Sequence, residues 1–166
     1  MPNAIHSTYT TATPLTIRLD LDEAADGTTG LGDGDARCST VVTGGTAPQV
    51  RFYYMVELQS DSDANTLVEF YLSRGSVGGT DIVSGAGAGA TDVDDGIAAA
   101  TLDKNQLQFV HAQVVDGDAT AYKGTFVVDD PTDDWRLIVV NETGGTFHAT
   151  AGNHVIEYRY ITPEVQ

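Results

Sequence analysis

Apolar and polar residues alternate through much of this chain, and the alternation predicts strands. The longest such segment spans residues 49–59. One face carries Val50, Phe52, Tyr54, Val56 and Leu58, and the other carries Arg51, Tyr53, Met55, Glu57 and Gln59. Because both faces carry bulky side chains, we expect a central strand or one whose outer face is covered by a partner.

The residues that follow predict a partner for this strand. Residues 60–65 are polar and predict a turn, and residues 66–73 alternate again, with Val68, Phe70 and Leu72 on one face. Two alternating segments separated by four to six residues are typical of a β-hairpin. We therefore expect 49–59 and 66–73 to pair with each other.

The C-terminal part predicts three more strands, at 122–128, 135–140 and 154–161. The first connection, Asp129–Asp134, contains Pro131, which fixes φ and cannot extend a ladder. The second begins at Asn141–Gly145, where two glycines allow positive φ. We expect these three strands to be the smallest unit able to pack a β core, with the rest of the chain arranged around it.

The remaining segments are shorter or less regular. Further strands are predicted at 14–22, 38–43, 80–83 and 107–115. Long loops are predicted at 23–37 and 84–104, and within the second loop residues 95–103 could form one or two helical turns. Residues 1–13 are polar and have no period, so we expect an arm that is disordered or ordered only by a partner.

Together these segments predict an all-β fold. Eight to ten short strands with turns between them and no βαβ alternation are typical of an antiparallel β-sandwich or jelly roll. At 166 residues, with 41% hydrophobic residues, the chain is long enough for a single domain with its own core. We expect that domain to span residues 14–166 and to contain at most one short helix.

The charge excludes several classes of partner. Eight basic residues face 24 acidic ones, which gives a formal net charge of −16. Such a field repels phosphate backbones and anionic membrane surfaces, so we expect neither nucleic acid nor membrane as a partner. The N-terminal residues contain no apolar signal region, and no run is long enough for a membrane span. We expect a protein made in a cytoplasm, and a saline environment would also fit the acidity.

Metal and cofactor sites are not predicted. Cys38 is the only cysteine, and we expect it to be a small buried residue. The histidines His6, His111, His148 and His154 lack the further ligands of a zinc site. No EF-hand loop occurs, although a looser calcium site could form from Asp33 and Asp35 or from Asp92 and Asp94.

Catalytic motifs are also missing from the sequence. Glu57, Glu69 and Glu157 lie on predicted strands, but their spacing does not select a catalytic pair. No nucleophile elbow or phosphate-binding loop occurs. The segment Asn141–Thr143 matches a glycosylation acceptor, yet we interpret it as a turn. We therefore expect a protein that is not an enzyme.

The aromatic residues suggest contact surfaces. Trp135 follows a turn directly and is expected to fill the core, although it could also stack on a sugar. The residues that we expect to form an interface with a sister subunit or another protein are Arg51, Tyr53, Met55, Tyr71, Tyr158 and Tyr160.

The segment Phe126–Asn141, followed by Thr143–Gly145, resembles the C-terminal half of the small jelly-roll decoration or cement proteins found on the heads of tailed viruses. The segments 52–58 and 68–76 fit the same pattern, so the resemblance covers roughly residues 50–161. It implies a structural virion protein on the capsid surface, without cofactor or catalytic residues. It also implies a trimer bound to the major capsid protein, which it reinforces.

Two alternatives remain open from the residues. The tyrosines, Trp135 and the acidic loops would also fit a carbohydrate-binding β-sandwich module. A tail or receptor-binding component of a virion would share the same fold and lack of catalytic motifs.

Overall fold

The computed structural model of the chain describes residues 5–11, 13–14, 30–39, 42, 47–60, 62–75, 97–98, 104–117, 120–129 and 134–165. These residues contain no α-helix and only two short 3-10 helices, η2 (Lys104–Gln106) and η3 (Ala151–Asn153). The strands are β1 (Ile5–Tyr9), β2 (Thr13–Pro14), β3 (Asp35–Cys38), β4 (Gln49–Ser60), β5 (Leu67–Gly75), β6 (Ile97–Ala98), β7 (Gln108–Val114), β8 (Ala121–Asp129), β9 (Asp134–Glu142), β10 (Thr146–Phe147) and β11 (Val155–Val165).

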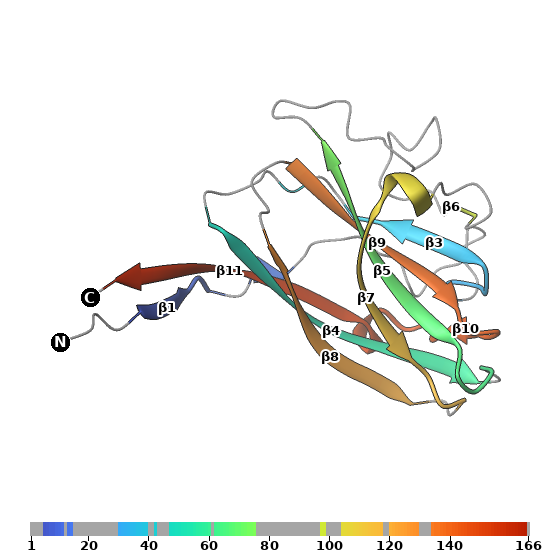
Figure 1. Ribbon diagram of the computed structural model, residues 1–166. Coiled ribbons are helices and arrows are strands. Elements are labelled where there is room, and N and C mark those ends of the chain that lie inside the picture. Colours follow the sequence, from blue (N-terminus) through green and yellow to red (C-terminus); the bar gives the residue numbers. More distant parts are fainter. Residues whose placement is uncertain are drawn as a thin grey trace.

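The strands form two antiparallel sheets that pack face to face (Figure 1). The β4 sheet contains β1, β2, β4, β8, β10 and β11, with β4 between β11 and β8. The β9 sheet has the order β6-β3-β9-β5-β7. The predicted all-β antiparallel sandwich is therefore confirmed, and β4 is a central strand as its sequence predicted.

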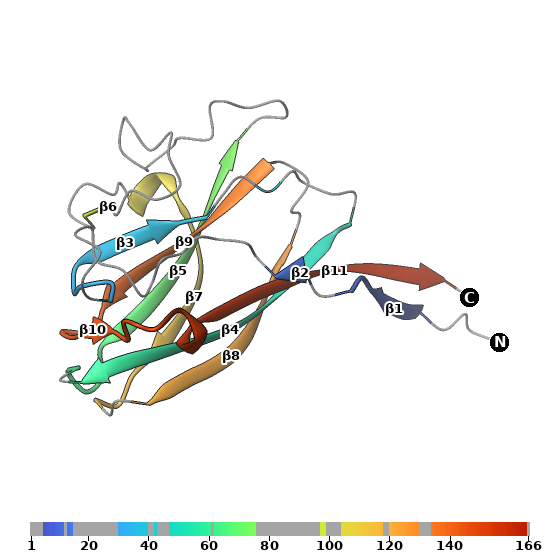
Figure 2. The same ribbon diagram turned by 180° about the vertical axis from the view of Figure 1, so that it is seen from behind.

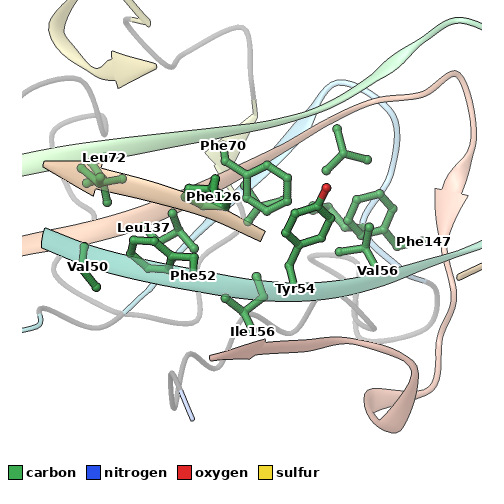
Figure 3. Packing of buried hydrophobic residues seen from close by; sticks show 14 of the residues in the cluster. Val50, Phe52, Tyr54, Val56, Phe70, Leu72, Phe126, Leu137, Phe147 and Ile156 are labelled. Atoms are coloured by element: carbon green, nitrogen blue, oxygen red, sulfur yellow. The ribbon is translucent and has the colours of Figure 1, made fainter. Parts of the chain in front are cut away.

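The core lies between the sheets and follows the alternation of β4. The residues of β4 that point inward are at most 4% exposed, and they are Val50, Phe52, Tyr54, Val56 and Leu58. Figure 3 shows Phe52 and Tyr54 of β4 close to side chains of the opposite sheet, among them Phe70 and Leu137. Trp135 is 1% exposed and packs edge-on against Phe52, with ring centroids 5.4 Å apart, so its expected place in the core is confirmed.

A hydrogen-bonded bridge joins the two sheets where β8 and β7 approach each other. The Tyr54 hydroxyl donates to Gln113 Oε1 at 2.6 Å and lies 2.9 Å from His111 Nε2. The His111 ring in turn stacks on Phe126 of β8. Gly124 makes room for the Tyr54 ring, because a Cβ at position 124 would lie 2.4 Å from the Tyr54 oxygen. The bridge therefore depends on a glycine in the middle of a strand.

The predicted hairpin of 49–59 with 66–73 is wrong. Both strands exist, but β4 pairs with β8, β10 and β11, whereas β5 pairs with β7 and β9. The connection between them crosses from one sheet to the other, and the rings of Tyr54 and Phe70 meet across the core at 4.8 Å. Two apolar strand faces can be buried against each other in this way as well as side by side, and the sequence pattern is the same for both arrangements.

The three predicted C-terminal strands exist as β8, β9 and β11, but they do not form one unit. β8 and β11 lie on either side of β4, and β9 is the centre of the other sheet. β8 and β9, which follow one another in the sequence, therefore belong to different sheets. Each of the three pairs with strands from earlier in the chain rather than with the other two.

Three smaller predictions also need correction. Residues 5–9 of the expected arm form β1, which pairs with β11 of its own chain. Strand β3 covers Asp35–Cys38, so it begins inside the loop expected at 23–37, and of the strand expected at 38–43 only Cys38 belongs to it, while residues 40, 41 and 43 lie outside the described residues. In the segment expected to be helical, residues 97–98 form β6 on the edge of β3, where backbone hydrogen bonding to a sheet edge outweighs the helical preference of alanine.

Some predictions lie outside the described residues. They are the strand at 80–83, residues 84–96 of the loop expected at 84–104, and nearly all of the strand at 14–22, of which only Pro14 is described, as part of β2.

Candidate interaction surface

The outward side of the β4 sheet gathers side chains from three neighbouring strands. The alternation of β4 points Arg51, Tyr53 and Met55 away from the core, and all three are partly exposed. The register with β11 places Arg159, Glu157 and Val155 beside them, and the register with β8 adds Val127, Thr125 and Lys123. We call these nine residues the β4 outer face.

Two arginines are held against tyrosine rings on this side of the sheet. The Arg159 guanidinium lies over the ring of Tyr53, 5.4 Å from its centroid. The Arg51 guanidinium lies over the ring of Tyr9 at the same distance of 5.4 Å. Such cation–π contacts contribute about 0.5–1 kcal/mol each at exposed sites and restrict the long arginine side chains. Tyr9, from the arm, therefore extends the β4 outer face beyond the three strands.

Apolar side chains remain exposed here. Val127 and Val155 are each 43% exposed, and Tyr9 is 47% exposed. Between β8 and β11 the surface is hollowed by about 250 Å³, and the hollow is lined by Tyr53, Tyr54, Met55, Lys123, Val155 and Glu157. A shallow, mostly apolar hollow with charged residues at its rim suits a side chain from another protein better than it suits an enclosed substrate.

The charge of the β4 outer face differs from that of the chain. It carries three of the eight basic residues, Arg51, Lys123 and Arg159, and one acidic residue, Glu157. The chain as a whole has a formal charge of −16. Aromatic, methionine and arginine side chains without an excess of acids are typical of the centre of protein–protein interfaces.

The other three expected interface residues lie elsewhere. Tyr158 and Tyr160 are on the inward side of β11, where Tyr158 packs edge-on against Trp135 with ring centroids 5.4 Å apart. Tyr71 is 6% exposed on the outward side of the β9 sheet. Burial and a hydrogen bond to Glu69 raise the pKa of Tyr71 to about 12. The structure therefore brings together Arg51, Tyr53 and Met55 and separates them from the other three.

Several members of this surface were not among the expected residues. Val155, Glu157 and Arg159 alternate along β11, but only the register shows that they lie beside β4. Tyr9 lies in the segment expected to be an arm that is disordered or ordered only by a partner, whereas its strand pairs with β11 of the same chain and places Tyr9 opposite Ile161. In the sequence, Tyr9 is the aromatic residue of a polar segment, and this feature alone could have indicated that the segment packs against the rest of the protein.

Several side chains that the sequence offered as a nucleophile, a metal ligand or a catalytic acid are buried or make hydrogen bonds and ion pairs within the fold. Cys38 is 1% exposed, as expected, and burial raises the pKa of its thiol. His154 accepts a hydrogen bond at Nδ1 from the Glu57 amide, and its Nε2 lies 2.8 Å from the His148 carbonyl oxygen. Glu69 pairs with Lys104 on the β9 sheet, far from the β4 outer face that carries Glu157.

Two other candidate sites lie near the bend that follows β9: the glycosylation motif at Asn141 and the calcium candidate Asp33. The Asn141 side chain is fully buried and donates hydrogen bonds to the carbonyls of Leu31 and Gly145. Asn141 and Glu142 still belong to β9, so the predicted turn begins only at Thr143, where the chain bends before β10. The Asp33 carboxylate accepts a hydrogen bond from the Gly144 amide, at a glycine with φ of 73°. Asp92 and Asp94 lie outside the described residues.

Within the described ranges, no three His, Cys, Asp or Glu side chains are placed so that they could hold a metal ion. No helix in the part of the chain that the structure covers is long and apolar enough to cross a membrane. No protein-family model matches the chain, and no curated protein matches its sequence.

Proposed function

We propose that this chain is a structural virion protein that decorates and reinforces a viral capsid shell, as a trimer that contacts the major capsid protein. The observation that carries the proposal is the β4 outer face. It combines exposed valines, arginine-capped tyrosines and an apolar hollow on a rigid sheet, in a chain that is otherwise strongly acidic.

The rest of the molecule supports a role in assembly. The segment that resembles decoration proteins, Phe126–Asn141, runs from β8 into β9 and so contributes a central strand to one sheet and a strand beside β4 to the other. Buried networks such as that of Asn141 hold the turns in one conformation. A sandwich of two packed sheets can present the same surface at many equivalent positions of a lattice.

The test is binding to empty heads of the virus whose genome encodes the chain. The purified protein is mixed with heads, the heads are pelleted, and the bound fraction is measured. Val155→Glu places a charge at the rim of the hollow and should weaken binding by about tenfold or more, equivalent to about 1.4 kcal/mol. Val114→Glu is the matched control, because Val114 is also exposed (54%) but lies on β7 of the other sheet.

The outcomes separate clearly. Binding that Val155→Glu abolishes and Val114→Glu preserves would support the proposal, provided that both variants retain the wild-type circular dichroism spectrum. A folded wild-type protein that stays in the supernatant at every concentration and is monomeric by light scattering would overturn it.

A carbohydrate-binding module is the second candidate, and the hollow favours it. Tyr53 offers a ring, and Lys123 and Glu157 offer charged groups that could bind hydroxyls. Arg159 already covers one side of the Tyr53 ring, however, which leaves less of it for a sugar. A glycan array would show binding that Glu157→Gln weakens, whereas an array without signal would remove this candidate.

A further inference from the structure

The strand β1 and the last residues of β11 form a two-stranded ribbon that extends beyond the sandwich (Figures 1 and 2). β11 pairs with β4 only as far as Ile161, which lies opposite Gln49 at the start of β4. Its remaining residues pair only with β1, in a register that joins Ile5 to Val165 and Tyr9 to Ile161. A ribbon of two strands is only marginally stable in water, so further pairing would stabilise it.

The register fixes which main-chain groups of β1 point away from β11. In an antiparallel pair, every second residue directs its N–H and C=O to its neighbour. The Thr10 amide donates to the Tyr160 carbonyl, so Thr10, Thr8 and the other even-numbered residues of this segment face β11. The main-chain groups of Ile5, Ser7 and Tyr9 therefore point away from β11, along an edge on which no strand of the described chain lies.

The other edge of the ribbon is blocked. Pro163 lies opposite Ser7, so its main-chain nitrogen faces away from β1, on the side that β4 no longer covers. Proline has no N–H to donate there, and proline on an edge strand prevents addition of another strand. β1 contains no proline, so only the edge of β1 is open to pairing.

Charge also favours contact at this edge. The first acidic residue of the chain is Asp20, so the whole N-terminal segment that contains β1 is free of carboxylate side chains. Two copies that each carry a formal charge of −16 repel one another, and the repulsion is smallest where they meet through an uncharged segment.

We propose that the free edge of β1 pairs with β1 of a second copy of this chain. The two strands run antiparallel about a twofold axis through Ser7, which places Ile5 of one copy opposite Tyr9 of the other. The contact is self-complementary, because Ile5, Ser7 and Tyr9 each present one donor and one acceptor at the same spacing. The result is a continuous four-stranded ribbon in the order β11-β1-β1-β11.

This pairing goes beyond the proposed function and does not depend on it. A twofold contact cannot relate the members of a three-membered ring, so it would link one trimer to the next, or two single copies if the chain does not decorate a capsid. Binding to heads and pairing through β1 are therefore measured separately.

The first experiment removes one main-chain donor from the edge. Ser7→Pro deletes the outward N–H and leaves the hydrogen bonds to β11 in place, since an extended strand accommodates the φ of proline. We expect its association constant, measured by sedimentation, to fall by about tenfold or more. Ser7→Ala retains the N–H and should associate as the wild type does. Protection of the Thr8 and Thr10 amides against hydrogen exchange would show that the ribbon of Ser7→Pro is intact.

The second experiment tests the register. Ser7→Cys places two cysteines directly opposite each other, at a Cα separation of about 5.5 Å that a disulfide can span. Tyr9→Cys places them about 14 Å apart, four residues along the strand, which is too far. Mild oxidation should therefore cross-link Ser7→Cys alone, and the buried Cys38 does not compete.

Association that Ser7→Pro reduces, together with selective cross-linking of Ser7→Cys, would establish the contact. Three results would overturn it: equal association of Ser7→Pro and wild type, equal cross-linking of the two cysteine variants, or a wild-type protein that is monomeric in high salt, where repulsion is screened.

Discussion

The outward sides of the two sheets differ sharply, although both belong to strands with apolar residues on both faces. On the β9 sheet, the outward residues Ala36, Cys38, Ile138 and Val140 are at most 1% exposed and form a second small core with Tyr71 and Leu107. On the β4 sheet, the outward residues Val127 and Val155 remain 43% exposed. The central strands of the β9 sheet are thus covered by their own chain, and the exposed apolar side chains on that side, Phe109 (55%) and Val114 (54%), lie on the edge strand β7. On the β4 sheet the exposed valines lie on the two strands that flank β4.

The charged groups show the same difference. Lys104 lies 2.6 Å from Glu69 Oε2 and 2.8 Å from Glu142 Oε1 on the β9 sheet. Burial lowers the pKa of Lys104, but the hydrogen bonds to Glu142 and Glu69 outweigh this and raise it. On the β4 outer face, Arg51 and Arg159 instead rest on tyrosine rings. The cation on the β9 sheet is therefore paired with carboxylates of its own chain, whereas the two arginines of the β4 outer face contact aromatic rings.

The largest expected difference in stability is between valine-to-alanine substitutions on the outward sides of the two sheets. Val140→Ala leaves a cavity in the second core and should lower the free energy of unfolding by about 2 kcal/mol, from two lost methyl groups and incomplete collapse. Val155→Ala should change it by less than about 0.5 kcal/mol, because that side chain is already exposed. Urea denaturation of both variants measures the difference. Equal destabilisation would show that the β4 outer face is also covered by its own chain.

A smaller effect is expected from the two lysines of the chain. Lys104→Met leaves two carboxylates without their cation and should cost about 1 kcal/mol, since these side chains are 34%, 17% and 41% exposed and partly screened. Lys123→Met, on the β4 outer face, should cost almost nothing. Thermal unfolding in low and high salt provides the comparison, and a loss at Lys104 that does not shrink in salt would argue against an electrostatic cause.

The smallest expected effect is a pH dependence of stability that arises from His111, which lies between the two sheets. Burial lowers the pKa of His111 below its ordinary value of about 6.5, so the unfolded chain binds a proton before the folded one does. Above pH 6.5, His111 is neutral in both states and does not lower the free energy of unfolding. Below that pH the unfolded chain is protonated more readily, so stability should fall as the pH decreases. Comparing unfolding between pH 7 and 5 for the wild type and His111→Gln tests this, because the variant should have a flatter dependence. An unchanged slope would assign the pH effect to other groups.

Which side chains point inward could be predicted along most of the strands, because a strand has a period of two wherever it lies. The inward set of β4, the burial of Trp135 and Cys38 and the bend at Thr143–Gly145 all follow from such local chemistry. The same is true of the all-β class, since every segment carries its own turn signals.

Strand partners could not be predicted in this way. Main-chain donors and acceptors are the same in every strand, so the choice between a hairpin and a crossing to the opposite sheet depends on how distant side chains pack. That choice sent β4 and β5 to different sheets, and it placed Tyr9 beside Arg51 and Val155 beside Met55. The β4 outer face and the edge of β1 follow from those long-range pairings. The first depends on β8 and β11 lying beside β4, and the second on β1 having β11 as its neighbour on one side and no described strand on the other.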